Sequence, residues 1–102
     1  MTVEPLSQKD VEDRLRELPG WSSDGVLLRR TYTFAGHAPA AALVLHISVT
    51  QEELGHHAEI TLGYNKVDIA VNTHSVGGKV TGLDIELARR IEAVASGHGA
   101  RG

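Results

Sequence analysis

The chain has 102 residues, of which 41% are hydrophobic and 23% charged, and it carries a formal net charge of −3. This length fits one domain with a modest core, and we interpret residues 1–102 as a single domain. No cluster of basic residues stands out, which argues against nucleic acid binding. The complete lack of cysteine excludes disulfides, thiolate metal sites and cysteine nucleophiles.

The N-terminus lacks the basic region and apolar run of a signal peptide. The longest apolar stretch, residues 38–49, is interrupted by His46 and is shorter than the roughly 20 residues that cross a bilayer. We therefore expect a cytoplasmic, soluble protein that has no membrane partner.

The first third of the chain predicts a helix followed by a hairpin. Ser7, with Asp10 three residues later, resembles a capping box, and the Pro-Gly pair at 19–20 ends the helix. The Asp-Gly pair at 24–25 is a strong turn signal, and apolar residues alternate along 26–34. These segments predict two antiparallel strands.

Residues 39–54 have the pattern of a helix with two apolar stripes. One stripe contains Leu43, Ile47, Thr50 and Leu54, and the other contains Ala42, Leu45 and Val49. Because apolar residues cover much of its circumference, we expect this helix to be buried on more than one side.

The second half of the chain repeats the plan. Residues 58–62 and 67–73 alternate like strands around a turn at 63–65. A capping box at Thr81 and Asp84 begins a last helix, and we expect the Gly-rich tail, residues 96–102, to be disordered. The order of elements predicts an α+β fold, a four-stranded antiparallel sheet with helices packed on one face (α-β-β-α-β-β-α).

The second hairpin brings histidines together. If Tyr64 and Asn65 centre its turn, the numbers of paired residues sum to about 129. His56 and His57 then lie at the open end of the hairpin, opposite His74, with Glu52 one helical turn upstream. The sequence therefore predicts three imidazoles and a carboxylate at one edge of the sheet.

Imidazoles titrate near neutral pH, so such a cluster can hold a proton donor and a proton acceptor at once. That arrangement suits a reaction in which a substrate eliminates water. Two other interpretations stay open. The histidines could cap carbonyls or face solvent, and three His with a Glu is a ligand set that zinc accepts. Neighbouring strand residues point to opposite faces, so we expect His56 and His57 not to share one ion, and we predict no metal.

The remaining candidates receive no functional role. His37, His46 and His98 are interpreted as surface or structural residues, and Trp21 as part of the core. Gly77-Gly78 lacks the surroundings of a phosphate-binding loop.

The segment E-E-L-G-H-H-A-E-I, residues 52–60, resembles the pterin-4a-carbinolamine dehydratases, and the resemblance continues through the second hairpin into the last helix. About four-fifths of the chain is covered, and H-H followed by Y-N-K-V and T-H at this spacing is a specific signal. The matching positions are Glu52-x3-His56-His57, Tyr64-Asn65-Lys66-Val67, Thr73-His74, Asp84 and Leu87-Ala88.

The resemblance implies the same α+β fold and an activity. The reaction is dehydration of 4a-hydroxytetrahydropterin to quinonoid dihydropterin, which recycles the cofactor of aromatic amino acid hydroxylases. The family uses no metal and no organic cofactor, and its members form homodimers or homotetramers. Such assembly would explain a helix at residues 39–54 that is apolar on two sides.

The same resemblance implies a role for each site residue. His56 and His74 would transfer protons at the 4a-hydroxyl and N5, His57 would hold or polarise the pterin ring, and Glu52 would orient a histidine. The expected substrate contacts are His57, Glu59, Ile60 and Thr73.

Three departures from the family pattern concern the shape of the site. Ala58 replaces a usual Pro, Ile60 replaces a usual aromatic residue, and the segment 77–83 is one residue longer, with Lys79 as the extra residue. A non-catalytic alternative also stands. Relatives act as a dimerisation cofactor for a homeodomain transcription factor or are linked to carboxysomal carboxylase assembly.

Overall fold

A computed structural model describes residues 4–101. Its centre is one antiparallel sheet with the spatial order β1–β2–β4–β3. The predicted α+β fold is confirmed. The strands are β1 (Ser22–Ser23), β2 (Leu28–Thr33), β3 (Glu59–Leu62) and β4 (Lys66–Val71).

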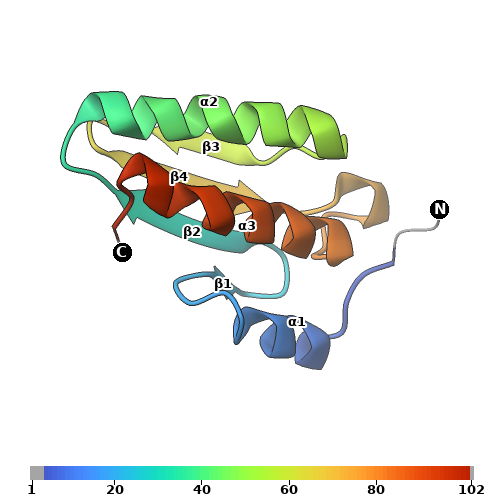
Figure 1. The fold of residues 1–102 in the computed structure, drawn as a ribbon. Helices are drawn as coiled ribbons and strands as arrows, with labels where there is room; N and C mark the ends of the chain where they lie inside the picture. Colours follow the sequence, from blue (N-terminus) through green and yellow to red (C-terminus); the bar gives the residue numbers. More distant parts are fainter. Residues whose placement is uncertain (1–3, 102) are drawn as a thin grey trace.

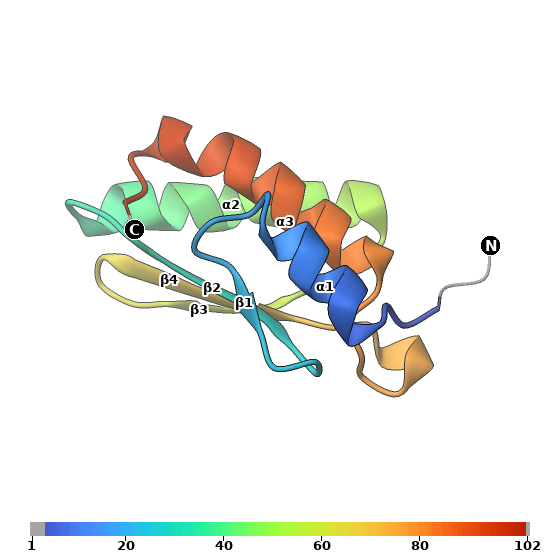
Figure 2. The ribbon, with the colours of Figure 1, turned by 90° about the horizontal axis from the view of Figure 1, so that it is seen from below.

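Three α-helices accompany the sheet: α1 (Gln8–Leu15), α2 (His37–Leu54) and α3 (Gly82–Ala95). Helices α2 and α3 lie side by side over one face of the sheet, and within residues 4–101 the opposite face carries no α-helix (Figures 1 and 2). The hydrophobic core fills the layer between these two helices and the sheet. No helix within the described residues is long and apolar enough to cross a membrane.

Strand β2 alternates between buried and exposed residues, and one inward residue is charged. Arg30 lies over the ring of Tyr32 at 4.2 Å, and its Nε is 3.6 Å from a carboxylate oxygen of Glu92 on α3. The same oxygen accepts hydrogen bonds from Trp21 Nε1, at 3.0 Å, and from the hydroxyl of Tyr32. Burial and this carboxylate raise the pKa of Tyr32 above its ordinary range. The network accommodates a cation in the core.

Helix α2 places only one of its two apolar stripes in the core. Leu43 and Ile47 are fully buried, whereas Leu45 and Val49 are 69% and 53% exposed. In the single chain the second stripe is therefore uncovered, contrary to the expected burial on two sides.

The C-terminal segment, where the sequence predicts a disordered tail, carries regular structure as far as Arg101. A 3-10 helix, η2 (Ser96–His98), follows α3, and Arg101 then pairs with the end of β2. Its N–H donates to Thr33 O at 2.8 Å, and its carbonyl accepts from Thr33 N at 3.0 Å. These two backbone bonds hold the segment; Gly102 lies outside the described residues.

Candidate active site

The register of the second hairpin is the one the sequence predicts. Glu59 pairs with Ala70, and Ile60 pairs with Ile69. His57 therefore precedes β3 at the end of the sheet where β4 finishes. His74 begins a 3-10 helix, η1 (His74–Val76), at that same end.

Two hollows meet at this end of the sheet. One, of about 350 Å³, contains His57 and His74 in its wall together with Leu27, Ala58, Glu59, Ala70 and Asn72. The other, of about 340 Å³, is lined by all three predicted histidines with Gly55, Asn72, Thr73, Ser75 and Leu83. The structure thus brings His56, His57 and His74 together. We call the combined space the histidine pocket.

His56 is the buried member of the three. Its side chain is 10% exposed, and Nε2 lies 2.5 Å from Oδ1 of Asp84, a carboxylate with no exposed surface. A carboxylate in this position fixes the orientation of the ring and stabilises positive charge that develops on it. Nδ1 is then the ring nitrogen of His56 that can serve a substrate.

Asp84 is itself held from two sides. Its Oδ2 accepts from the backbone N–H of Thr81 at 2.7 Å and from the hydroxyl of Thr73 at 2.9 Å. Thr81 and Asp84 also form the predicted capping box of α3. The carboxylate therefore ties His56 to the first turn of a long helix and leaves it little freedom to move.

His57 has a different environment. Its Nε2 lies 3.3 Å from Oε1 of Glu52, and the two side chains are 55% and 79% exposed. This pair is open to water and screened by it, so Glu52 orients His57 only loosely. The side chains of His56 and His57 thus have different carboxylate partners.

The remaining predicted substrate contacts divide between two sides of the sheet. Glu59 lines the histidine pocket. Ile60, its neighbour on β3, instead packs against the hydrophobic core. Thr73 is only 4% exposed, and its hydroxyl is engaged by Asp84 and by Thr81. Thr73 is nevertheless part of the wall of the histidine pocket. The substrate contacts expected of Thr73 and Ile60 stay predictions.

Asp84 is the site residue that sequence reasoning missed as a partner of histidine. Its local pattern, three residues after Thr81, was explained by helix capping. The contact with His56 joins residues 28 positions apart, so no short-range spacing could reveal it. Within residues 4–101, no group of three or more His, Cys, Asp or Glu side chains is placed to hold a metal ion.

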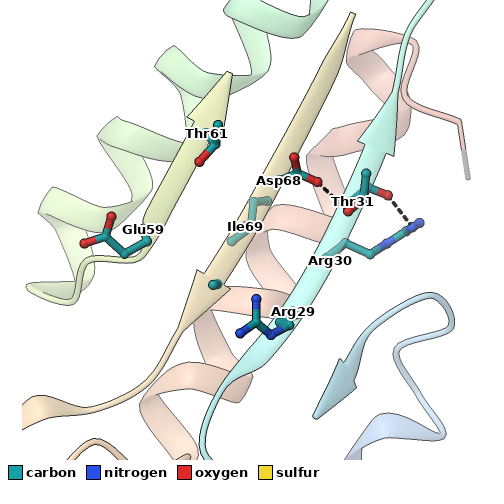
Figure 3. Close-up of a pocket in the computed structure, with 8 residues that line it drawn as sticks. Arg29, Arg30, Thr31, Glu59, Thr61, Asp68 and Ile69 are labelled. Atoms are coloured by element: carbon teal, nitrogen blue, oxygen red, sulfur yellow. Dashed lines mark hydrogen bonds between the residues drawn. The ribbon is translucent and has the colours of Figure 1, made fainter. Parts of the chain in front are cut away.

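A third hollow, of about 320 Å³, lies beside the histidine pocket on the open face of the sheet (Figure 3). It shares Glu59 and Ala70 with that pocket. Across its floor, Thr31 donates a hydrogen bond to Asp68 at 2.6 Å. Arg29 also lines it, and Figure 3 shows this side chain reaching over β4. A bound molecule could therefore extend from the histidines onto the polar face of the sheet.

These features define a class of small α+β protein with a histidine pocket at the open end of its second hairpin. A family model described as pterin 4 alpha carbinolamine dehydratase matches residues 4–94. The chain belongs to this family, as its sequence resemblance indicated.

Relatives agree over nearly the whole chain. A Streptomyces avermitilis protein named for the same dehydratase is 61% identical over 100 residues, which cover 98% of this chain and 99% of that protein. A Thermomicrobium roseum relative, also named for it, is 40% identical over 91 residues, or 89% and 97% of the two chains.

Two solved structures share the fold. The transcriptional coactivator/pterin dehydratase from Brucella melitensis superposes with a TM-score of 0.84 at 34% identity, covering 90% of this chain and 99% of that one. A pterin dehydratase-like protein identified as a RuBisCO assembly factor in the alpha-carboxysome gives 0.60 at 22% identity, covering 74% and 86%.

Proposed function

We propose that the chain dehydrates 4a-hydroxytetrahydropterin to quinonoid dihydropterin by histidine acid/base catalysis, and so serves tetrahydrobiopterin recycling. The observation that carries the proposal is the histidine pocket, in which one imidazole is backed by a buried carboxylate. Family membership supports the choice of a pterin carbinolamine as substrate.

The reaction removes one proton and supplies another. A base takes the proton from N5, the C4a–O bond breaks, and the electron pair of the N5–H bond forms the C4a=N5 double bond. An acid protonates the departing hydroxyl, which leaves as water. No electrons are gained or lost overall, so the step needs no redox cofactor.

We assign the base to His56 and the acid to His74. Asp84 stabilises the positive charge that His56 acquires when it takes a proton. His74 is exposed, so it can recover its proton from solvent after each turnover. His57 and Glu59 line the histidine pocket beside His74, and they would contact the pterin.

The test is a rate measurement on carbinolamine generated in situ, in which the appearance of quinonoid dihydropterin is followed with and without protein. We expect acceleration over the spontaneous reaction, with His56→Ala and His74→Ala each losing about 10²–10⁴-fold of it. His37→Ala is the matched control, because this exposed histidine binds Tyr64 O outside the pocket.

The same assay addresses a non-catalytic alternative. One neighbour with this fold is an assembly factor, and at 22% identity the likeness extends to the fold alone. Wild-type protein that gives no acceleration would exclude the dehydratase proposal. A protein partner recovered in stoichiometric amount would then support an assembly role.

A further inference from the structure

The hollow of about 320 Å³ beside the histidine pocket, which we call the open-face hollow, has no part in the proposed proton transfer (Figure 3). Two rows of residues build it across three strands. In the first row, Arg29 of β2 and Glu59 of β3 flank Ala70 of β4. In the second row, two threonines flank Asp68 in the same way. Ala70 carries only a methyl group between two long charged side chains, and it lines both the open-face hollow and the histidine pocket.

Several polar groups of the open-face hollow are available to a ligand. Within residues 4–101, the side chains of Arg29 and Glu59 form no ion pair and no hydrogen bond, and the charge of Arg29 acts on Asp24 only beyond ion-pair distance. Oδ1 of Asp68 accepts a hydrogen bond from Thr31, which leaves Oδ2 to accept another. The hollow therefore offers one guanidinium and two carboxylates to a bound molecule.

The second arginine at this hollow is already occupied. The side chain of Arg30 is 8% exposed, and its Nη1 donates to the backbone oxygen of Thr31 at 2.8 Å. Its Nε lies 3.6 Å from the carboxylate of Glu92 on the other side of the sheet, so this charge is compensated inside the protein. Figure 3 shows Arg30 directed away from β4, whereas Arg29 reaches over it.

The signs of the charges select the kind of group that fits the open-face hollow. Glu59 and Asp68 repel an anion, and Arg29 repels a cation. A neutral group with several hydroxyls suits both kinds of side chain. Each hydroxyl can donate a hydrogen bond to a carboxylate and accept one from a guanidinium. The lining therefore favours a polyhydroxylated group over a charged one.

The open-face hollow is placed to receive a substituent of the molecule in the histidine pocket. Residues two apart on a strand share a face and lie about 6.8 Å apart, so the first row begins just past His57. Small-molecule sites usually measure roughly 300–1,000 Å³. The two hollows, of about 350 and 320 Å³, fit a ring in one and a short side chain in the other. In a tetrahydropterin the side chain is on C6, which is bonded to the reacting N5.

We propose that the open-face hollow binds a neutral, hydroxylated side chain on C6 of the pterin, and that Arg29 and Asp68 determine the preference for it. This inference rests on the proposed function and names the class of its substrate. Hydrogen bonds to the side chain are the same in the bound carbinolamine and in the transition state. They therefore lower KM and leave kcat unchanged.

The test compares two carbinolamines generated in situ. One is derived from tetrahydrobiopterin, which has a dihydroxypropyl group on C6, and the other from 6-methyltetrahydropterin, which has no hydroxyl there. We expect the wild-type kcat/KM to be about tenfold higher for the first, with the difference in KM. Arg29→Leu and Asp68→Asn should each lower the ratio of the two kcat/KM values roughly threefold or more.

Lys66→Gln is the matched control. It removes a positive charge from the same face of the sheet, at the position of β4 that pairs with Thr33, and Lys66 does not line the open-face hollow. This variant should keep the wild-type ratio. Thermal unfolding shows whether each variant folds.

The outcomes separate this inference from the dehydratase proposal. If both carbinolamines are accelerated equally, or if Arg29→Leu and Asp68→Asn keep the wild-type ratio, this inference is overturned and the dehydratase proposal stands. If neither carbinolamine is accelerated, the dehydratase proposal falls. Calorimetry with 7,8-dihydrobiopterin and 6-methyl-7,8-dihydropterin then decides the binding of the side chain, and equal affinities overturn it.

Discussion

The carboxylate of Asp84, fully buried at the start of α3, lies 2.5 Å from Nε2 of His56. Its second oxygen is occupied by Thr73 and by the backbone of Thr81. The ring that we assign as base is thus positioned by a residue that belongs to the cap of another element. Positioning and helix capping depend on the same side chain.

Asp84→Asn is expected to lower the kcat of dehydration at least about tenfold, with a smaller change in KM, because the amide cannot stabilise a charged imidazole as a carboxylate does. Steady-state rates on generated carbinolamine measure the effect. Asp10→Asn is the matched control, since Asp10 lies at the equivalent position of α1. An unchanged kcat in Asp84→Asn would remove this residue from the mechanism.

Glu52→Gln should have little effect on stability, and less effect on rate than Asp84→Asn. Both members of the Glu52–His57 pair are more than half exposed, and exposed ion pairs contribute at most about 1 kcal/mol to the free energy of unfolding. Urea unfolding and the dehydration assay together give the comparison. A rate loss as large as that of Asp84→Asn would contradict a loose orientation of His57 by this carboxylate.

The raised pKa of Tyr32 predicts that the free energy of unfolding falls at alkaline pH. Burial and Glu92 raise the pKa of Tyr32 above its ordinary value of 10.0, so the unfolded chain ionises first as the pH rises. The stabilisation that un-ionised Tyr32 gives to the folded state is fully present below pH 10 and is lost as the pH rises above it. Urea unfolding between pH 8 and pH 11 should show this decline in wild type and a weaker one in Tyr32→Phe. Tyr64→Phe, at an exposed turn residue, should decline like wild type.

The uncovered stripe of α2 predicts self-association. Leu45 and Val49 are large apolar side chains at the surface, and a patch of this kind commonly marks an interface. Light scattering after gel filtration should give a homodimer or homotetramer for wild type and a smaller species for Leu45→Glu/Val49→Glu. A monomeric wild-type protein would show that the stripe has another use.

Local patterns accounted for the hairpins and for the neighbourhood of His57 and His74. A turn centred on Tyr64 and Asn65 fixes the register of both strands, because each residue along a strand has one partner. The alternation that places Val67, Ile69 and Val71 in the core also carries Thr73 inward, as observed. The expected contact of Thr73 with substrate came from resemblance and stays a prediction.

Contacts between distant segments were not predictable. Asp84 with His56, Glu92 with Arg30 and Arg101 with Thr33 each join residues whose separation carries no periodic signal. Arg30 in particular breaks the apolar pattern of β2, and its burial depends on an acidic residue on the last helix. Tertiary partners decide such positions, and a single sequence does not name them.

The position of β4 between β2 and β3 has a consequence for how the chain folds. The β3–β4 pairing closes a short loop, whereas the β2–β4 pairing must close across the whole of α2. Short loops close quickly and distant pairings slowly. We expect His57 and His74 to meet early in folding and His56 to gain its carboxylate partner only when α3 docks. The pocket would then form before it can catalyse the proposed reaction.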